Sequence, residues 1–169
     1  LDEILDNCQK EEERKRTEEL IRPILRGRDI KRYGYNWAGL YLIATFPSRH
    51  YDIEQYPAVR DYLLSFGKER LEQTGKVYTV NGEKVKARKK TNNKWFETQD
   101  SISYWDLFFQ PHICWKAVGR NLAFALVESG TFLTAPASFI SAGIYNNLIL
   151  AYLRSNVGKY FIYLFSATL

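Results

Sequence analysis

Short apolar segments of two kinds occur along this chain of 169 residues, and they restrict the fold to a mixture of helices and small sheets. Segments rich in β-branched and aromatic residues predict strands, whereas apolar residues spaced three and four apart predict helices. We expect strands over 40–46, 77–80, 83–87, 113–118, 122–127 and 131–133, and helices over 1–21, 53–71, 144–154 and 158–165. This order predicts the α+β class, with a mixed or antiparallel sheet and flanking helices.

The most specific local signal is Asn81-Gly82, which lies between two alternating segments. Both residues tolerate the left-handed backbone of a two-residue turn, so the pair predicts a β-hairpin. Alternation along the second strand places Lys84 and Lys86 on one face, together with Arg88 if the strand continues that far.

Charge is unevenly distributed along the chain, although its net value is only +5. Residues 1–21 hold eight acidic against four basic residues, a net charge of −4, which leaves 20 basic against 11 acidic residues, or +9, in 22–169. Basic residues concentrate in 22–32 and 76–94. We therefore predict an acidic linker helix over 1–21, ended by Pro23, and a basic domain over 22–169.

Several classes of function lack their sequence signatures in this chain. No GxGxxG, Walker A, HExxH or GxSxG motif occurs, and Cys8 and Cys114 are isolated from each other and from His50 and His112. The sequence therefore predicts no metal site and no bound cofactor, and two unpaired thiols fit the reducing cytoplasm. Polar residues interrupt the apolar segment 144–169, so we read it as two core-packed helices and expect no membrane span.

Basic residues interleaved with aromatic and amide side chains indicate a nucleic-acid contact, because Lys and Arg neutralise phosphates while Arg and Asn also read base edges. In 24–33 we expect a basic loop whose Gly27 lets the backbone turn or approach a ligand closely. The candidate DNA-binding residues are Arg26, Gly27, Arg28, Lys31, Arg32, Lys84, Lys86, Arg88, Lys89, Lys90, Asn93, Lys94, Lys116, Arg120 and Asn121.

Other interpretations of these residues remain open. The hairpin lysines could form a solvated edge, and the arginines beside Gly27 could pair with Asp29. Asp29 and Lys31 also match half of a metal-nuclease motif, which would make the chain a Mg²⁺-dependent nuclease, but no second carboxylate is evident. A protein-interaction module, using the acidic segment and the aromatic residues, is a further alternative.

The order of several segments resembles the TaqI-like C-terminal specificity domain, over about residues 20–165. The most specific string is Ile24–Tyr33 (ILRGRDIKRY). The other matching strings are Arg22-Pro23, Tyr41-Leu42-Ile43, Tyr56-Pro57-Ala58, Tyr62-Leu63, Lys94-Trp95-Phe96-Glu97 and Phe109-Gln110-Pro111-His112-Ile113-Cys114-Trp115. His112 stands where the family commonly has Lys.

This domain is the target-recognition part of adenine-N6 DNA methyltransferases and of the bacterial type IIG restriction–modification enzymes. The resemblance implies double-stranded DNA as the partner of a non-catalytic domain that positions the target adenine for an upstream methyltransferase domain. It also implies that the whole enzyme uses S-adenosylmethionine and Mg²⁺, and that the chain stops before the family's last helix.

Overall fold

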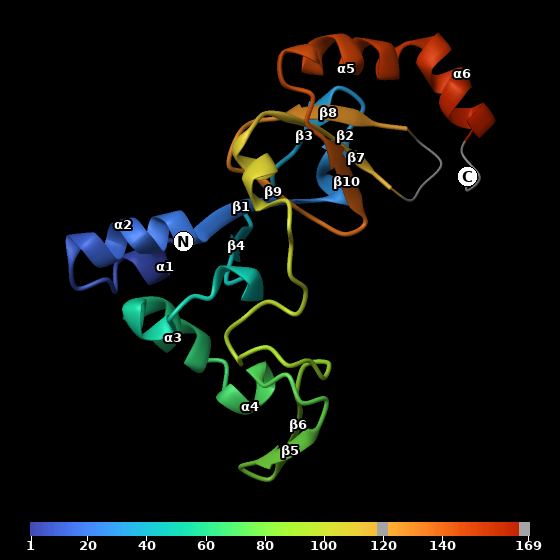
Figure 1. Ribbon diagram of the computed structural model, residues 1–169. Coiled ribbons are helices and arrows are strands. Elements are labelled where there is room, and N and C mark those ends of the chain that lie inside the picture. The colour runs from blue at the N-terminus through green and yellow to red at the C-terminus, as the bar shows by residue number, and fades with distance from the viewer. Residues whose placement is uncertain (118–121, 166–169) are drawn as a thin grey trace. The chain divides into compact units, whose positions relative to one another are not determined.

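A computed structural model of the chain describes residues 1–117 and 122–165 and shows an α+β fold, as the sequence predicts (Figure 1). The α-helices are α1 (Asp2–Leu5), α2 (Glu11–Leu20), α3 (Pro57–Leu64), α4 (Lys68–Leu71), α5 (Asn146–Arg154) and α6 (Asn156–Phe165). The strands are β1 (Ile21–Arg26), β2 (Ile30–Lys31), β3 (Gly34–Tyr35), β4 (Tyr41–Ile43), β5 (Val77–Val80), β6 (Glu83–Lys86), β7 (His112–Lys116), β8 (Phe124–Val127), β9 (Phe132–Thr134) and β10 (Ala137–Ile140).

These elements form two compact units, each built from two segments of the chain. Unit 1 contains Leu1–Ile21 and Ile43–Ser103, and unit 2 contains Arg22–Leu42 and the described residues from Tyr104 onward. Within residues 1–117 and 122–165, no helix has both the length and the apolar character that crossing a membrane requires.

Residues 1–21 are not the single linker helix that the sequence predicts. They form α1 and α2 and contribute Ile4, Leu20 and Ile21 to the core of unit 1. Glu13, in the polar middle of the segment, is buried because its carboxylate accepts hydrogen bonds from the backbone N–H groups of Ala58 (3.0 Å) and Gln9 (3.2 Å). The acidic segment therefore packs within unit 1, where the Glu13 carboxylate of α2 accepts from a backbone N–H at the start of α3.

The other predictions for unit 1 are confirmed in part. The hairpin forms as expected from β5 and β6, and both Asn81 (φ 51°) and Gly82 (φ 85°) adopt the positive φ angles of its turn. The helix predicted over 53–71 is instead split into a 3₁₀ turn, α3 and α4. Gly67 lies between the two α-helices, and its φ angle of 86° is outside the range of a right-handed helix.

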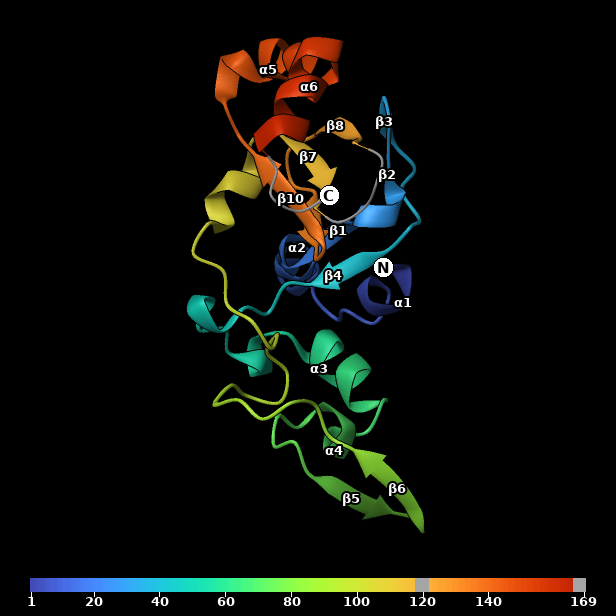
Figure 2. The ribbon, with the colours of Figure 1, turned by 90° about the vertical axis from the view of Figure 1, so that its right-hand side faces the viewer.

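The centre of unit 2 is the antiparallel sheet β10-β7-β8, whose two faces pack against different elements. Ile113 and Phe124 point to one face and pack with Leu150 of α5, so α5 and α6 lie on the same side of this sheet in both views (Figures 1 and 2). Cys114 and Ala125, one residue further along each strand, point to the opposite face and pack with Leu25 and Ile30.

A second sheet, β4-β1-β9, corrects the interpretation of 24–33 as a loop. The first part of that segment, Ile24–Arg26, is the end of β1 and pairs in parallel with Phe132–Thr134 of β9. The strand predicted over 40–46 is confirmed only as the short β4, whose three residues are Tyr41–Ile43. β10, which follows Pro136, was not predicted because the segment around it, 135–142, consists mostly of small or polar residues.

The two C-terminal helices are confirmed, but their core packing is incomplete. Leu150 is buried, whereas Ile144 (89% exposed), Leu148 (69%) and Tyr160 (62%) present apolar side chains to solvent.

Aromatic rings surround His112 at the start of β7. Phe108 stacks on Phe132 with a centroid distance of 4.3 Å, and the His112 ring lies edge-on to Phe139 at 5.1 Å. The Nδ1 atom of His112 is 2.9 Å from the carbonyl oxygen of Gln110, while its buried Nε2 has no hydrogen-bond partner among the described residues. Burial therefore lowers the pKa of His112 and favours the neutral ring.

This lowered pKa predicts that the free energy of unfolding falls as the pH drops below about 6.5, the ordinary value for histidine. The unfolded chain takes up a proton there that the folded chain excludes, so stability is lost from that pH down to the folded pKa. Urea titrations across this range test the prediction. His112→Phe should flatten the dependence and His50→Asn, at an exposed histidine, should not; the same dependence in H112F would contradict it.

Candidate nucleic-acid interface

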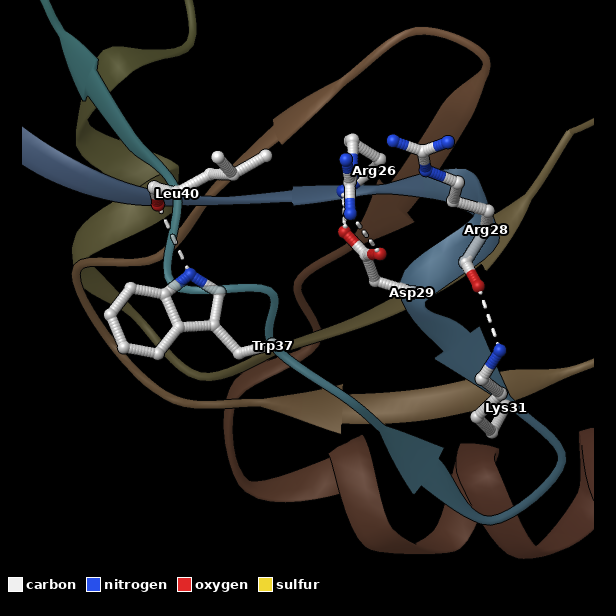
Figure 3. Close-up of polar contacts among 6 residues, drawn as sticks. All are labelled: Arg26, Arg28, Asp29, Lys31, Trp37 and Leu40. Carbon is white, nitrogen blue, oxygen red and sulfur yellow. Dashed lines mark hydrogen bonds and ion pairs between the residues drawn. The ribbon is translucent and has the colours of Figure 1, made fainter.

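The turn between β1 and β2 is fixed by an ion pair between Arg26 and Asp29. One carboxylate oxygen of Asp29 accepts from the backbone N–H and Nε of Arg26 (2.9 and 3.0 Å), and the other accepts from Nη2 (2.9 Å), as Figure 3 shows. These hydrogen bonds lower the pKa of Asp29, whose side chain is buried. The Arg26 guanidinium is thus engaged within the turn, although the sequence made it a candidate DNA contact.

Arg28 lies in the same turn but has a different environment. Its side chain is exposed, and no hydrogen bond joins its guanidinium to the Arg26–Asp29 pair (Figure 3). The carbonyl oxygen of Arg28 accepts a hydrogen bond from Nζ of Lys31 at 2.9 Å, which holds a second cation beside it. The turn therefore uses one arginine for structure and presents the other to solvent.

A concave surface beside this turn, which we call the basic hollow, has a volume of about 790 Å³. Five cationic side chains and no Asp or Glu are among the described residues that line it. Such a concentration of one charge attracts anions and focuses the field within the hollow. Its lining residues are Gly27, Arg28, Ile30, Lys31, Arg32, Lys116, Leu122, Ala123, Lys159 and Tyr163.

Gly27 contributes to the hollow by allowing a close contact within the protein. A Cβ atom at this position would lie 3.2 Å from Cγ of Lys116, on the neighbouring strand β7. The absence of a side chain thus brings the turn against the stem of Lys116. The sequence predicts that the backbone at Gly27 turns or approaches a ligand closely. In the structure, the group that lies close to Gly27 is the side chain of Lys116.

Lys159 and Tyr163 were not predicted from the sequence, because the last helices were read as core. The two residues are one helical turn apart on α6 and lie on the same face. α6 meets α5 closely at Gly158, where a Cβ atom would lie 2.1 Å from the carbonyl oxygen of Tyr152. The signal that could have identified this face is a lone lysine in an apolar helix with a tyrosine four residues later.

The second basic surface is on unit 1, and we call its exposed lysines the hairpin patch: Lys84, Lys86, Lys89, Lys90 and Lys94. Lys84 pairs with Thr79 and Lys86 with Val77, so the two lysines share one face of the hairpin, as alternation predicts. The structure therefore separates the candidate residues into a basic hollow on unit 2 and a hairpin patch on unit 1.

Two candidates near the hairpin instead hold the loop that follows it. The guanidinium of Arg88 donates to the carbonyl oxygens of Leu71 (2.7 Å), Glu97 (3.0 Å) and Trp95. Its pKa is lowered by desolvation. Asn93 donates through Nδ2 to two carbonyl oxygens, of Thr98 and Gln99, both at 3.0 Å. The side chains of Arg88 and Asn93 therefore form their hydrogen bonds within unit 1.

Two further predicted DNA contacts, Arg120 and Asn121, lie outside the described residues.

The nuclease alternative does not fit the geometry of Asp29. Both carboxylate oxygens are bonded to Arg26, and the described part of the chain contains no group of three or more His, Cys, Asp or Glu residues placed to hold a metal. Asp29 is therefore a structural partner of Arg26, and among residues 1–117 and 122–165 it belongs to no cluster of the carboxylate ligands that Mg²⁺ prefers.

Asp29→Asn should lower the free energy of unfolding by about 1–2 kcal/mol, the typical effect of losing a charged cap on backbone N–H groups. Because Arg26 lowers the pKa of Asp29, the wild-type chain should also lose stability below about pH 4, and D29N should lack this component. Urea titrations measure both effects. Asp106→Asn, at an exposed aspartate of the same unit, is the control; equal stabilities of D29N and D106N would contradict the structural role.

Arg88→Lys should lower the stability of unit 1 by about 1–3 kcal/mol, because an ammonium group cannot reach three separate carbonyl oxygens. Lys89→Ala, one residue further along and exposed, should leave stability nearly unchanged. Thermal unfolding of both variants tests the assignment, and an R88K variant as stable as K89A would show that Arg88 is not structural.

Comparison with known proteins assigns no family to this arrangement. No protein-family model matches the chain, and no curated protein sequence matches it. The resemblance to the TaqI-like specificity domain stays a prediction from the residues of this chain. The function proposed below is argued from the charges and geometry of the basic hollow.

Proposed function

We propose that this chain is the DNA target-recognition part of a type IIG-like adenine-N6 methyltransferase. The observation that supports the proposal most strongly is the basic hollow, which combines five cations with no carboxylate among its described lining residues. The positive charge of such a surface suits a phosphodiester backbone, and its concave form focuses that charge. The chain would act without chemistry of its own and hold DNA while a separate domain modifies the adenine.

The cations of the hollow differ in what they can recognise. Lys31, Lys116 and Lys159 carry compact ammonium charges, which suit phosphates without selecting a sequence. Arg28 carries a planar fork of N–H donors that can bind the major-groove edge of guanine through two hydrogen bonds. We therefore assign binding strength to the lysines and the first candidate for base reading to Arg28.

The hairpin patch would supply a second contact from unit 1. A two-stranded ribbon fits the major groove of B-DNA, and the shared face of Lys84 and Lys86 would meet phosphates there. Arg88 and Asn93 would support this contact indirectly, because they hold the loop that carries Lys89, Lys90 and Lys94.

The catalytic parts of the proposed enzyme would lie upstream in the same chain and work in the cytoplasm. They would bind S-adenosylmethionine for methyl transfer and Mg²⁺ for cleavage. We propose the methyltransferase domain as the protein partner, and the exposed apolar side chains of α5 and of the turn before it, such as Leu148 and Ile144, favour a protein contact of this kind.

Arg28→Ala should weaken binding to duplex DNA by about 5- to 150-fold, corresponding to about 1–3 kcal/mol. If Arg28 reads a base, the loss should be confined to sequences with that base; if it contacts phosphate, all sequences should be affected and the salt slope should decrease by about 1. Fluorescence anisotropy over about 50–200 mM salt, with a duplex of about 20 base pairs, makes the measurement.

Arg70→Ala, at an exposed arginine outside the basic hollow and the hairpin patch, removes the same charge and serves as the matched control. Equal affinities and equal salt slopes for R28A and R70A would exclude the hollow as the DNA contact. Binding of the wild-type chain that does not change with salt would contradict the electrostatic basis of the proposal.

A further inference from the structure

The basic hollow contains more than positive charge. Ile30 is buried and Leu122 and Ala123 are half-buried, so they form an apolar floor, while Arg28, Lys31 and Lys116 are exposed around it. Ile30 and Ala123 belong to the same apolar cluster as Leu25 and Cys114, and the floor is therefore continuous with the core of unit 2.

An aromatic ring completes this lining. Tyr163 on α6 is 55% exposed and shares the hollow with Lys159, which lies one helical turn before it. A planar ring beside several cations can stack on a nucleobase while the cations hold the adjoining phosphates.

Duplex DNA does not use an apolar floor of this kind. The outside of a duplex presents phosphates and sugars, while the faces of its bases are stacked within the helix. Unpaired nucleotides expose those faces, and proteins bind them by combining a positively charged groove with aromatic and apolar surfaces. The volume of about 790 Å³ also lies in the range of sites that hold organic ligands, about 300–1,000 Å³, and so exceeds what a phosphate alone requires.

We propose that the basic hollow binds an unpaired segment of a polynucleotide strand, with its phosphates on Lys31, Lys116 and Lys159 and a base stacked on Tyr163. This inference rests on the proposed function for the claim that the chain binds nucleic acid. It adds that the hollow selects unpaired nucleotides over paired ones. In a bound duplex, the hollow would hold nucleotides of a locally opened strand.

The test compares single strands with duplexes on the full chain. The probes are fluorescent oligothymidylate and oligouridylate of about ten nucleotides and a blunt duplex with the same number of phosphates. Tyr163→Ala should weaken binding of oligothymidylate by about 5- to 150-fold, the effect of losing one stacked base. Tyr163→Phe keeps the ring and should bind almost as the wild type does.

Tyr160→Ala is the matched control, because Tyr160 is an equally exposed tyrosine of α6 that does not line the hollow. Y160A should leave oligothymidylate binding unchanged, and neither variant should unfold the chain, since both rings are exposed. Equal binding of oligouridylate would support a site that accepts either sugar and does not need the thymine methyl group, and tighter binding of one probe would show which of the two strands the site prefers.

The inference is overturned if Y163A binds oligothymidylate as tightly as the wild type, or if inorganic polyphosphate of equal charge competes as well as the oligonucleotide. Binding of the duplex without binding of oligothymidylate would also overturn it and leave the proposed function standing. Failure to bind either nucleic acid would instead remove the proposed function itself.

Discussion

The bidentate pairing of Arg26 with Asp29 is the interaction on which the candidate interface depends. It closes the turn between β1 and β2, so that Gly27 lies against Lys116 and Arg28 extends into solvent. A charged pair can hold such a turn because each carboxylate oxygen of Asp29 accepts from the Arg26 guanidinium, and one of them also accepts from the backbone N–H of Arg26. The charge of Arg26 is therefore neutralised by Asp29 at the edge of the basic hollow. The cations available to a ligand are those outside this pair.

The cations that remain are carried by elements from distant parts of the chain. Arg28, Lys31 and Arg32 follow β1, Lys116 ends β7, and Lys159 comes from α6. Their mutual repulsion is moderated because their charged groups are in water while their aliphatic stems can cover the apolar floor. Binding of an anion would relieve this repulsion, and it would also cover apolar surface if the anion carries a base or sugar.

The elements that the sequence predicts well are those defined by local chemistry. Asn81 and Gly82 specify their turn through backbone angles alone, and alternation then fixes the face of Lys84 and Lys86. The α+β class and the cluster of basic residues after β1 follow from similar short-range patterns. These features need no knowledge of which distant segments meet.

The features that the sequence does not reveal depend on tertiary contacts. Nothing near Arg88 shows that its guanidinium reaches carbonyl oxygens of three other residues, and Glu13 is buried only because α3 begins beside it. Lys159 and Tyr163 line the hollow through the tertiary packing of α6, which also approaches α5 closely at Gly158. The assignment of 1–21 as a separate linker failed for the same reason.

The central claim is that the basic hollow of unit 2 contacts nucleic acid, and acetylation of lysines in the presence and absence of DNA tests it most directly. Peptide mass spectrometry after brief acetylation reports the accessibility of each ammonium group. Bound DNA should protect Lys116 and Lys159 while Lys15 and Lys68, which are outside both basic surfaces, stay reactive. Unchanged acetylation of Lys116 and Lys159 at saturating DNA would contradict the account.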